Sequence, residues 1–233
     1  MCGTGELRAS REFSESDNSS TSEPQFHAAA FLLFCDRTRD RQAMSLTTTT
    51  PMTVEEFFDW QSRQDRNYEL VDGVPVMTVK AMTGATDQHD RITVNAIVSL
   101  GTRLRGKPCR PKTSDTSVLT WRGTRRPDIT VECGRPDPRS MAADEPRLVI
   151  EILSPSTMRF DRFQKLAEYQ RHPSIAVILL VDSEKPQVAV WRRSGDIWDT
   201  VEIEGIEATV DLPEIGTALP LSELYEDVTF SER

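Results

Sequence analysis

The stretch LVIEILSPST, residues 148–157, says more about the fold of this 233-residue chain than any other part of it. Its first six residues are apolar except Glu151, so this acid lies inside a hydrophobic strand. A carboxylate in such a strand must be paired, protonated or bound to a metal, because burying it bare costs several kcal/mol. The segment SPST then ends the strand and offers hydroxyl groups to cap the next element of the chain. We therefore expect a central strand that carries one functional acid.

Regular patterns on both sides of this stretch predict alternating helices and strands. Helical spacing of apolar residues or helix-start signals favour helices near residues 53–60, 87–104 and 161–171. β-prone runs favour strands at residues 68–71, 74–79, 117–121, 128–132, 147–153, 175–181 and 187–193, the last of them an edge strand. The dipeptide Asp72-Gly73 predicts a hairpin between the first two strands. The expected fold class is α/β, with a mixed β-sheet flanked by helices.

A second acid, Asp128, stands at the start of the apolar strand that precedes Glu151 in the chain. Two carboxylates on neighbouring strands form an oxygen site that suits Mg²⁺ or Mn²⁺. The alternative is a structural salt bridge to Arg125, Arg126 or Lys165, since ion-pair networks also hold buried acids. Taken one residue at a time, the two interpretations are equally favoured.

The helix expected after the SPST segment carries further polar side chains toward these acids. Asp161, Lys165 and Tyr169 recur at four-residue intervals, so they project on nearly one helix face. This spacing is also typical of ordinary pairing on a helix surface. Glu69 is one more acid inside an apolar segment, YELVDG at residues 68–73.

Five segments in this order resemble a known family. They are YELVDG at 68–73, RPDITV at 126–131, LVIEILSPST at 148–157, DRFQKLAEY at 161–169 and ILLVD at 178–182. Together they resemble the restriction endonuclease (Uma-two) branch of the PD-(D/E)XK nuclease superfamily, over roughly residues 52–230.

The resemblance implies a restriction-endonuclease-like core and a Mg²⁺-dependent (or Mn²⁺-dependent) endonuclease that hydrolyses phosphodiester bonds in DNA. It implies that Asp128 and Glu151 hold the metal and that Glu69 contributes directly or through water. The superfamily lysine should follow the strand glutamate by two residues, where this chain has Leu153. The resemblance implies that Lys165 of the following helix takes this role, which completes the catalytic set.

Charge is unevenly distributed along the chain. The net charge is −9, which excludes a uniformly basic nucleic-acid binder, and residues 196–233 hold eleven acids against one base. The segment 103–126 has the opposite balance, and we expect its basic residues to contact the DNA backbone. These residues are Arg103, Arg105, Lys107, Arg110, Lys112, Arg122, Arg125 and Arg126. The alternative is a solvated, charged surface.

Residues 1–43 are expected to be a disordered N-terminal extension, because residues 12–23 are rich in Ser, Glu, Asp and Asn. Residues 44–233 then form the endonuclease-like domain, with an acidic C-terminal segment. No apolar stretch approaches the roughly 20 residues of a membrane span, so we expect a cytoplasmic protein. A homodimer is a further expectation, since cutting both DNA strands favours two sites.

The remaining candidates are weaker. Cys109 and Cys133 are expected to be packed thiols, and the four cysteines match neither a zinc site nor a dense disulfide framework. His89 is expected to face solvent or cap its helix. Two alternative functions stay open: a nucleic-acid-binding module without catalysis, and a protein-interaction module whose acids form a buried ion-pair network. The DNA target, its strandedness and the biological pathway do not follow from the sequence.

Overall fold

The computed structural model describes residues 50–78, 84–153 and 161–230, with the backbone alone at residues 161–163. All of them lie in one compact unit, Thr47–Arg233. The N-terminal extension expected at residues 1–43 and the SPST segment at 154–157 lie outside the described residues.

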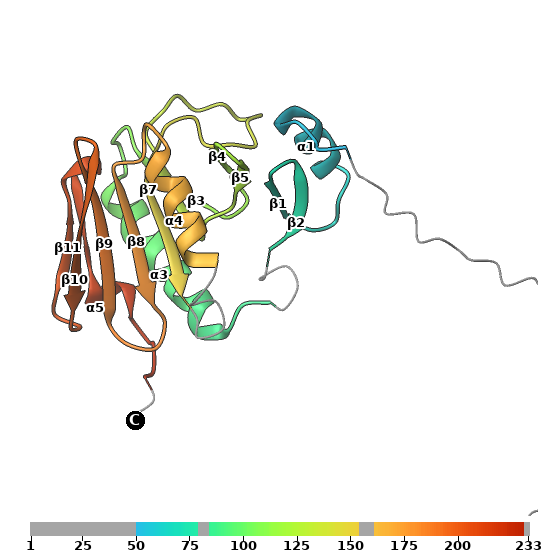
Figure 1. Cartoon of the computed structure of the whole chain (residues 1–233). Helices are drawn as coiled ribbons and strands as arrows, with labels where there is room; N and C mark the ends of the chain where they lie inside the picture. Colours follow the sequence, from blue (N-terminus) through green and yellow to red (C-terminus); the bar gives the residue numbers. More distant parts are fainter. Residues whose placement is uncertain (1–49, 79–83, 154–160, 231–233) are drawn as a thin grey trace, which may run out of the picture. The chain divides into compact units, whose positions relative to one another are not determined.

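A six-stranded mixed sheet forms the centre of this unit (Figure 1), with the strand order β10-β9-β8-β7-β6-β3. Its strands are β3 (Arg110–Thr113), β6 (Ile129–Glu132), β7 (Pro146–Leu153), β8 (Val177–Asp182), β9 (Gln187–Ser194) and β10 (Ile197–Glu204). The pair β7–β8 is parallel and the other neighbours are antiparallel. The predicted α/β class with a mixed sheet is confirmed.

Helices cover both faces of this sheet. The helix α3 (Asp87–Arg103) and α5 (Leu221–Leu224) share one apolar core with Leu148, Ile150 and Ile152 of β7. The strands β11 (Thr209–Leu212) and β12 (Thr217–Pro220) and the 3₁₀ helix η1 (Pro213–Ile215) pack into the same core. The helix α4 (Asp161–Arg171) packs against Val149 and Leu153 on the opposite face. Since side chains alternate along a strand, Glu151 lies on the α4 face.

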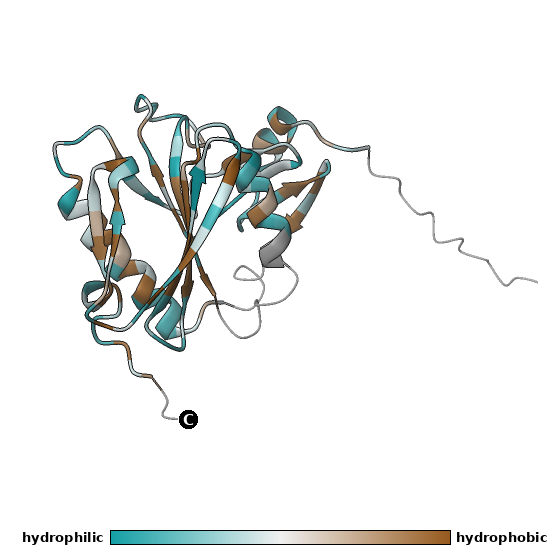
Figure 2. Cartoon of the chain, turned by 60° about the vertical axis from the view of Figure 1, so that its left-hand side comes forward, coloured by the Kyte–Doolittle hydropathy of each residue, from teal (hydrophilic) through white to brown (hydrophobic). Residues whose placement is uncertain are grey.

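Hydropathy along the strands fits this two-sided burial. Figure 2 shows hydrophobic residues along the central strands and hydrophilic ones on many of the connecting segments. Ile150, Ile178 and Leu179 are fully buried. A carboxylate placed in such a strand, as Glu151 is, therefore needs a specific partner.

A smaller antiparallel sheet with the order β2-β1-β5-β4 carries Glu69 on β1 and Arg125 on β5. Its strands are β1 (Tyr68–Val71), β2 (Val74–Met77), β4 (Val118–Thr120) and β5 (Gly123–Arg125), and α1 (Val54–Gln61) precedes them with the predicted Thr53–Glu56 capping box. Asp72 and Gly73 have φ angles of 50° and 79°, as the predicted two-residue hairpin turn requires. The chain passes from β5 through Arg126 and Pro127 to Asp128, so the two sheets meet at that acid.

Two predictions are wrong. The strand at residues 187–193 was expected at a sheet edge, but β9 lies between β8 and β10. The edge strands are β10 and β3, and β10 is largely exposed and rich in acids.

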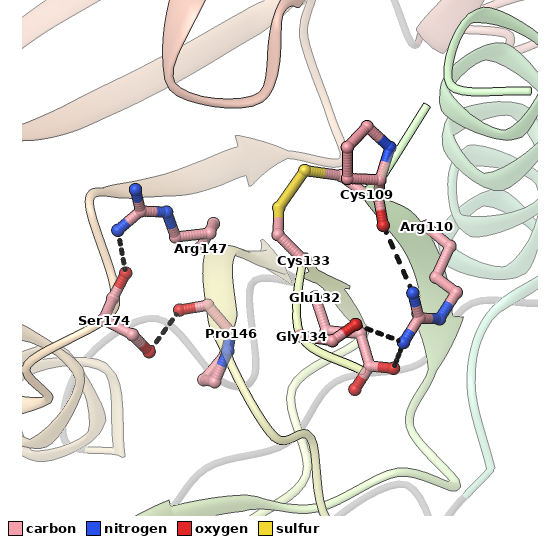
Figure 3. Close-up of a disulfide and its surroundings, with 9 residues drawn as sticks. Cys109, Arg110, Glu132, Cys133, Gly134, Pro146, Arg147 and Ser174 are labelled. Carbon is pink, nitrogen blue, oxygen red and sulfur yellow. Dashed lines mark hydrogen bonds and ion pairs between the residues drawn. A yellow bond between two sulfur atoms is a disulfide. The ribbon is translucent and has the colours of Figure 1, made fainter. Parts of the chain in front are cut away.

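Cys109 and Cys133 form a disulfide rather than packed thiols (Figure 3). Arg110 pairs with Glu132 in the β3–β6 register, so the next residues outward, the two cysteines, face each other across the strands. The spacing of the cysteines in the sequence does not reveal this long-range register. The disulfide lies at the end of β6 opposite to Asp128.

Among the described residues, no helix is long and apolar enough to cross a membrane.

Candidate active site

Asp128 lies immediately before β6, and Glu151 lies on the adjacent strand β7. Ile129 pairs with Ile150, and one further step of this antiparallel register sets Asp128 opposite Glu151. Asp128 is 3% exposed, and its Oδ2 accepts a hydrogen bond of 2.6 Å from the backbone N–H of Ile152. The backbone of β7 therefore fixes the carboxylate that the neighbouring chain segment supplies.

Glu151 points toward α4, where Tyr169 meets it. The Tyr169 hydroxyl donates a hydrogen bond of 2.7 Å to Glu151 Oε1. Burial, and then the nearby charge of Glu151, raise the pKa of Tyr169 well above its ordinary value. The phenol therefore keeps its proton and acts as a donor that holds the strand glutamate in place.

Glu69 and Lys165 are 96 residues apart in the chain and form an ion pair, with Nζ 3.0 Å from Oε1. Glu69 also accepts hydrogen bonds from the backbone N–H of Arg126 and from Nη1 of Arg125, each 3.0 Å long. Burial by itself would raise the pKa of Glu69, but the charge of Lys165, the Arg126 N–H and the charge of Arg125 together lower it below the ordinary value. The carboxylate is therefore ionised at neutral pH.

Glu168 is a buried acid that the sequence did not reveal. It is 1% exposed and accepts hydrogen bonds from Arg125 through Nε at 2.8 Å and through Nη2 at 2.6 Å. The Thr120 hydroxyl donates a third hydrogen bond of 2.9 Å. Its position three residues after Lys165, on the same side of α4, is the signal that could have identified it. Arg125 thus links Glu168 to Glu69.

Arg125 and Arg126 are buried, at 4% and 6% exposure, and serve the interior of the protein. Arg126 donates to the backbone carbonyls of Tyr68, Ser114 and Asp115, and burial lowers its pKa below the ordinary arginine value. This placement favours a structural role for both residues over contact with a DNA backbone.

The other basic residues of segment 103–126 are spread over several elements. Arg103 pairs with Glu223, Arg122 with Asp72, and both Arg110 and Lys112 with the buried Glu132. Lys107 donates to the carbonyl of Gly216, whereas Arg105 is exposed. Most of these cations pair with acids of separate elements, and DNA contact by them stays a prediction.

His89 was expected to face solvent or cap its helix, and this is wrong. It is 6% exposed, and its Nε2 lies 3.2 Å from Oδ2 of Asp128. His89 stands three residues before Ile92 on the buried face of α3, which continues through Ala96 and Leu100. The helical spacing of these positions is the signal that could have placed the histidine against the sheet.

The donor chemistry fits a divalent cation held by two carboxylates. Mg²⁺ is commonly bound through one or two carboxylates, with water and substrate phosphate in the other positions. In residues 50–78, 84–153 and 161–230, no group of three or more His, Cys, Asp or Glu side chains is arranged to hold a metal ion. Asp128 and Glu151 are the two carboxylates that such a site would use.

The chain is similar to two known proteins over most of its length. Two proteins of Synechocystis sp., named uncharacterized protein slr1290 and uncharacterized protein sll1609, are 27% and 26% identical to this chain over 186 and 174 residues. The alignments cover 77% and 72% of this chain and 94% and 96% of those proteins.

A crystal structure from Anabaena variabilis, described as "a putative nuclease belonging to DUF820", has the same fold, with a TM-score of 0.60 at 18% identity. The match covers 75% of this chain and 98% of that one. The profile of the family Uma2, described as "Putative restriction endonuclease", matches residues 54–222. Because this match spans most of the chain, and because its five sequence segments predicted the same family, the protein belongs to the Uma2 family.

Proposed function

We propose that the protein is a Mg²⁺-dependent endonuclease that hydrolyses phosphodiester bonds in DNA, with Mn²⁺ able to replace Mg²⁺. The proposal rests on one observation. Asp128, at the start of β6, lies opposite Glu151 of β7, and each carboxylate accepts a hydrogen bond from a buried donor. Membership of a family described as restriction endonucleases supports the same reaction class.

A divalent cation held by Asp128 and Glu151 would polarise the scissile phosphate and lower the pKa of a bound water. The chain's own residues keep the two carboxylates ready for this role. The Ile152 N–H orients Asp128, and the Tyr169 hydroxyl orients Glu151. Neither donor has to move for the reaction, which is the preorganisation that makes electrostatic stabilisation effective.

Lys165 supplies the positive charge in this proposal. Its side chain is 14% exposed and lies on α4 four residues before Tyr169, whose hydroxyl reaches Glu151. An ammonium group there can offset the negative charge that grows on phosphate oxygens. Glu69 holds the ammonium group at 3.0 Å, while Arg125 and Arg126 hold Glu69.

DNA is the proposed partner, and Arg105 is an exposed cation able to contact its backbone. A homodimer is proposed because two sites can cut both strands. The cytoplasmic location is proposed as well, and the Cys109–Cys133 disulfide is the observation that speaks against it, since structural disulfides are rare in reducing compartments.

A protein-interaction module is the second candidate function. The observation that favours it is the buried ion-pair cluster in which Arg125 bridges Glu69 and Glu168. In that case the acids would stabilise the fold and bind no metal.

The experiment is cleavage of covalently closed plasmid DNA, because a closed circle reports internal cuts alone. Wild-type protein and Asp128→Asn are purified in parallel and incubated with Mg²⁺, with Mn²⁺ or with EDTA. The proposal predicts nicked and linear DNA from the wild type with either metal, and intact plasmid with EDTA or with the variant. Equal cutting by both preparations would reveal a contaminating nuclease and contradict the assignment of the site. No cutting together with no metal binding by calorimetry would favour the protein-interaction module.

A further inference from the structure

His89 is a buried side chain whose position is fixed by the start of α3. Its backbone N–H donates to the Thr86 hydroxyl, which caps the helix, over 3.3 Å. The Thr93 hydroxyl donates to the His89 carbonyl over 2.8 Å and lies 3.5 Å from Nδ1. The imidazole is therefore mounted on a rigid element, and it is 6% exposed.

This ring meets Asp128 on one particular oxygen. Nε2 of His89 lies 3.2 Å from Oδ2, the same atom that accepts the Ile152 N–H at 2.6 Å. An ionised carboxylate can only accept hydrogen bonds, so Nε2 carries the proton in this contact. One donor comes from a helix and the other from the central sheet, and together they set both the position and the rotation of the carboxylate.

We propose that His89 is a positioning residue that holds Asp128 through Oδ2 in the orientation that the carboxylate needs to bind the divalent cation. The inference rests on the proposed function, because it assigns the contact to the same metal site. Hydrogen-bond partners of metal-binding side chains orient those ligands, and their loss typically lowers metal affinity by about 10-fold to 100-fold. A histidine that only fills space beneath α3 would have no such effect on metal binding.

The test compares His89→Leu, which fills the space without a donor, with His89→Gln, whose amide N–H can replace the donor. The matched control is His172→Leu, because His172 faces Ser174 rather than an acid. Mn²⁺ affinity is measured by calorimetry in the absence of DNA. Single-turnover and steady-state cleavage of plasmid DNA then separate kcat from KM.

We expect His89→Leu to bind Mn²⁺ about 10-fold to 100-fold more weakly than the wild type, and His89→Gln to recover most of that loss. His89→Leu should also lower kcat at a fixed metal concentration. Its KM for DNA should change less than about twofold, since the substitution does not alter binding of the DNA backbone. The His172→Leu control should match the wild type in metal affinity.

A folded His89→Leu protein with wild-type Mn²⁺ affinity would overturn the inference and leave the proposed nuclease standing. Weaker metal binding by His89→Leu without DNA cleavage by any variant would support the inference and contradict the endonuclease. A wild type that binds no Mn²⁺ would overturn both. If His89→Leu does not fold, His89→Asn replaces it in the test, because the asparagine amide is too short to reach Asp128. Wild-type Mn²⁺ affinity in His89→Asn would refute the positioning role.

Discussion

Replacing Arg125 with methionine tests whether this arginine is part of the interior or part of a DNA-binding surface. Arg125 donates three hydrogen bonds of 2.6 to 3.0 Å, two to Glu168 and one to Glu69, and is 4% exposed. Arg125→Met keeps most of the side-chain volume and removes every donor. The variant therefore leaves two buried carboxylates without their shared cation.

The cost depends on the partners that each acid retains. Glu69 keeps Lys165 and the Arg126 N–H, whereas Glu168 keeps the Thr120 hydroxyl and an Arg122 guanidinium at 3.7 Å. Removing one partner of a buried pair typically costs about 3–5 kcal/mol, and we expect this range for the free energy of unfolding of Arg125→Met. Most of the loss should come from Glu168, so the double variant Arg125→Met/Glu168→Met should lose less than about 2 kcal/mol.

Urea denaturation followed by circular dichroism measures these differences, provided that the m-value stays constant between variants. Arg105→Met is the matched control, because Arg105 is exposed and its replacement should change the free energy of unfolding by less than about 0.5 kcal/mol. The reasoning is refuted if Arg125→Met costs less than about 1 kcal/mol, or if the double variant is less stable than the single one. DNA affinity measured at several salt concentrations should fall for Arg105→Met.

Three further predictions concern the site and the disulfide. Lys165→Met should lower kcat about 100-fold or more and leave metal affinity nearly unchanged, as stopped-time cleavage assays and calorimetry would show; an unchanged rate removes Lys165 from the mechanism. The pKa of Glu69 is lower in the folded protein than its ordinary value of 4.5. Glu69 therefore stabilises the folded protein fully above its ordinary pKa, and this stabilisation disappears as the pH falls through the pKa of the folded state. Urea unfolding between about pH 5 and pH 3 should therefore show a smaller loss of stability with decreasing pH in Glu69→Gln than in the wild type, and equal slopes would contradict this. Cys109→Ser removes a cross-link between residues 24 apart and should lower the free energy of unfolding by about 3 kcal/mol relative to the oxidised wild type. A non-reduced peptide map of the wild type should contain a peptide linked through Cys109 and Cys133.

Local patterns predicted most of the regular structure. The Thr53–Glu56 capping box and the Asp72-Gly73 turn are short-range features, and the structure has both. The unbroken apolar run at residues 175–181 is typical of a strand that is buried on both faces, and β8 contributes to two separate cores. The strands β3, β5, β10, β11 and β12 were not predicted, because β10 faces solvent and the other four are only three or four residues long.

Long-range contacts explain what the sequence did not reveal about the site. Asp128 and Glu151 were identified as acids of apolar strands, and the family resemblance then assigned roles to them, to Glu69 and to Lys165. The structure brings Glu69 and Lys165 to 3.0 Å. The sequence did not single out Glu168, because its partner Arg125 is 43 residues away in the chain. Pairings of this kind depend on how sheets and helices pack together, which local periodicity does not encode.

The Arg103–Arg126 segment shows the same limit for charge. Its eight cations are dense in sequence, a local excess that a polyanion-binding surface could use. In the fold, Arg110 and Lys112 pair with the buried Glu132 and Arg125 with two buried acids. Charge density along a chain therefore does not distinguish a binding surface from an internal ion-pair network, because the acidic partners come from distant segments.

The central claim is that Asp128 and Glu151 form the metal centre of a nuclease. The most direct measurement is a calorimetric Mn²⁺ titration of the wild type and Glu151→Gln, with plasmid cleavage by the same preparations. Glu207→Gln serves as control, since Glu207 is exposed on the acidic C-terminal segment. We predict that the wild type and Glu207→Gln bind Mn²⁺ and cut the plasmid, whereas Glu151→Gln stays folded and does neither. Metal binding and cleavage at wild-type levels by Glu151→Gln would contradict the account.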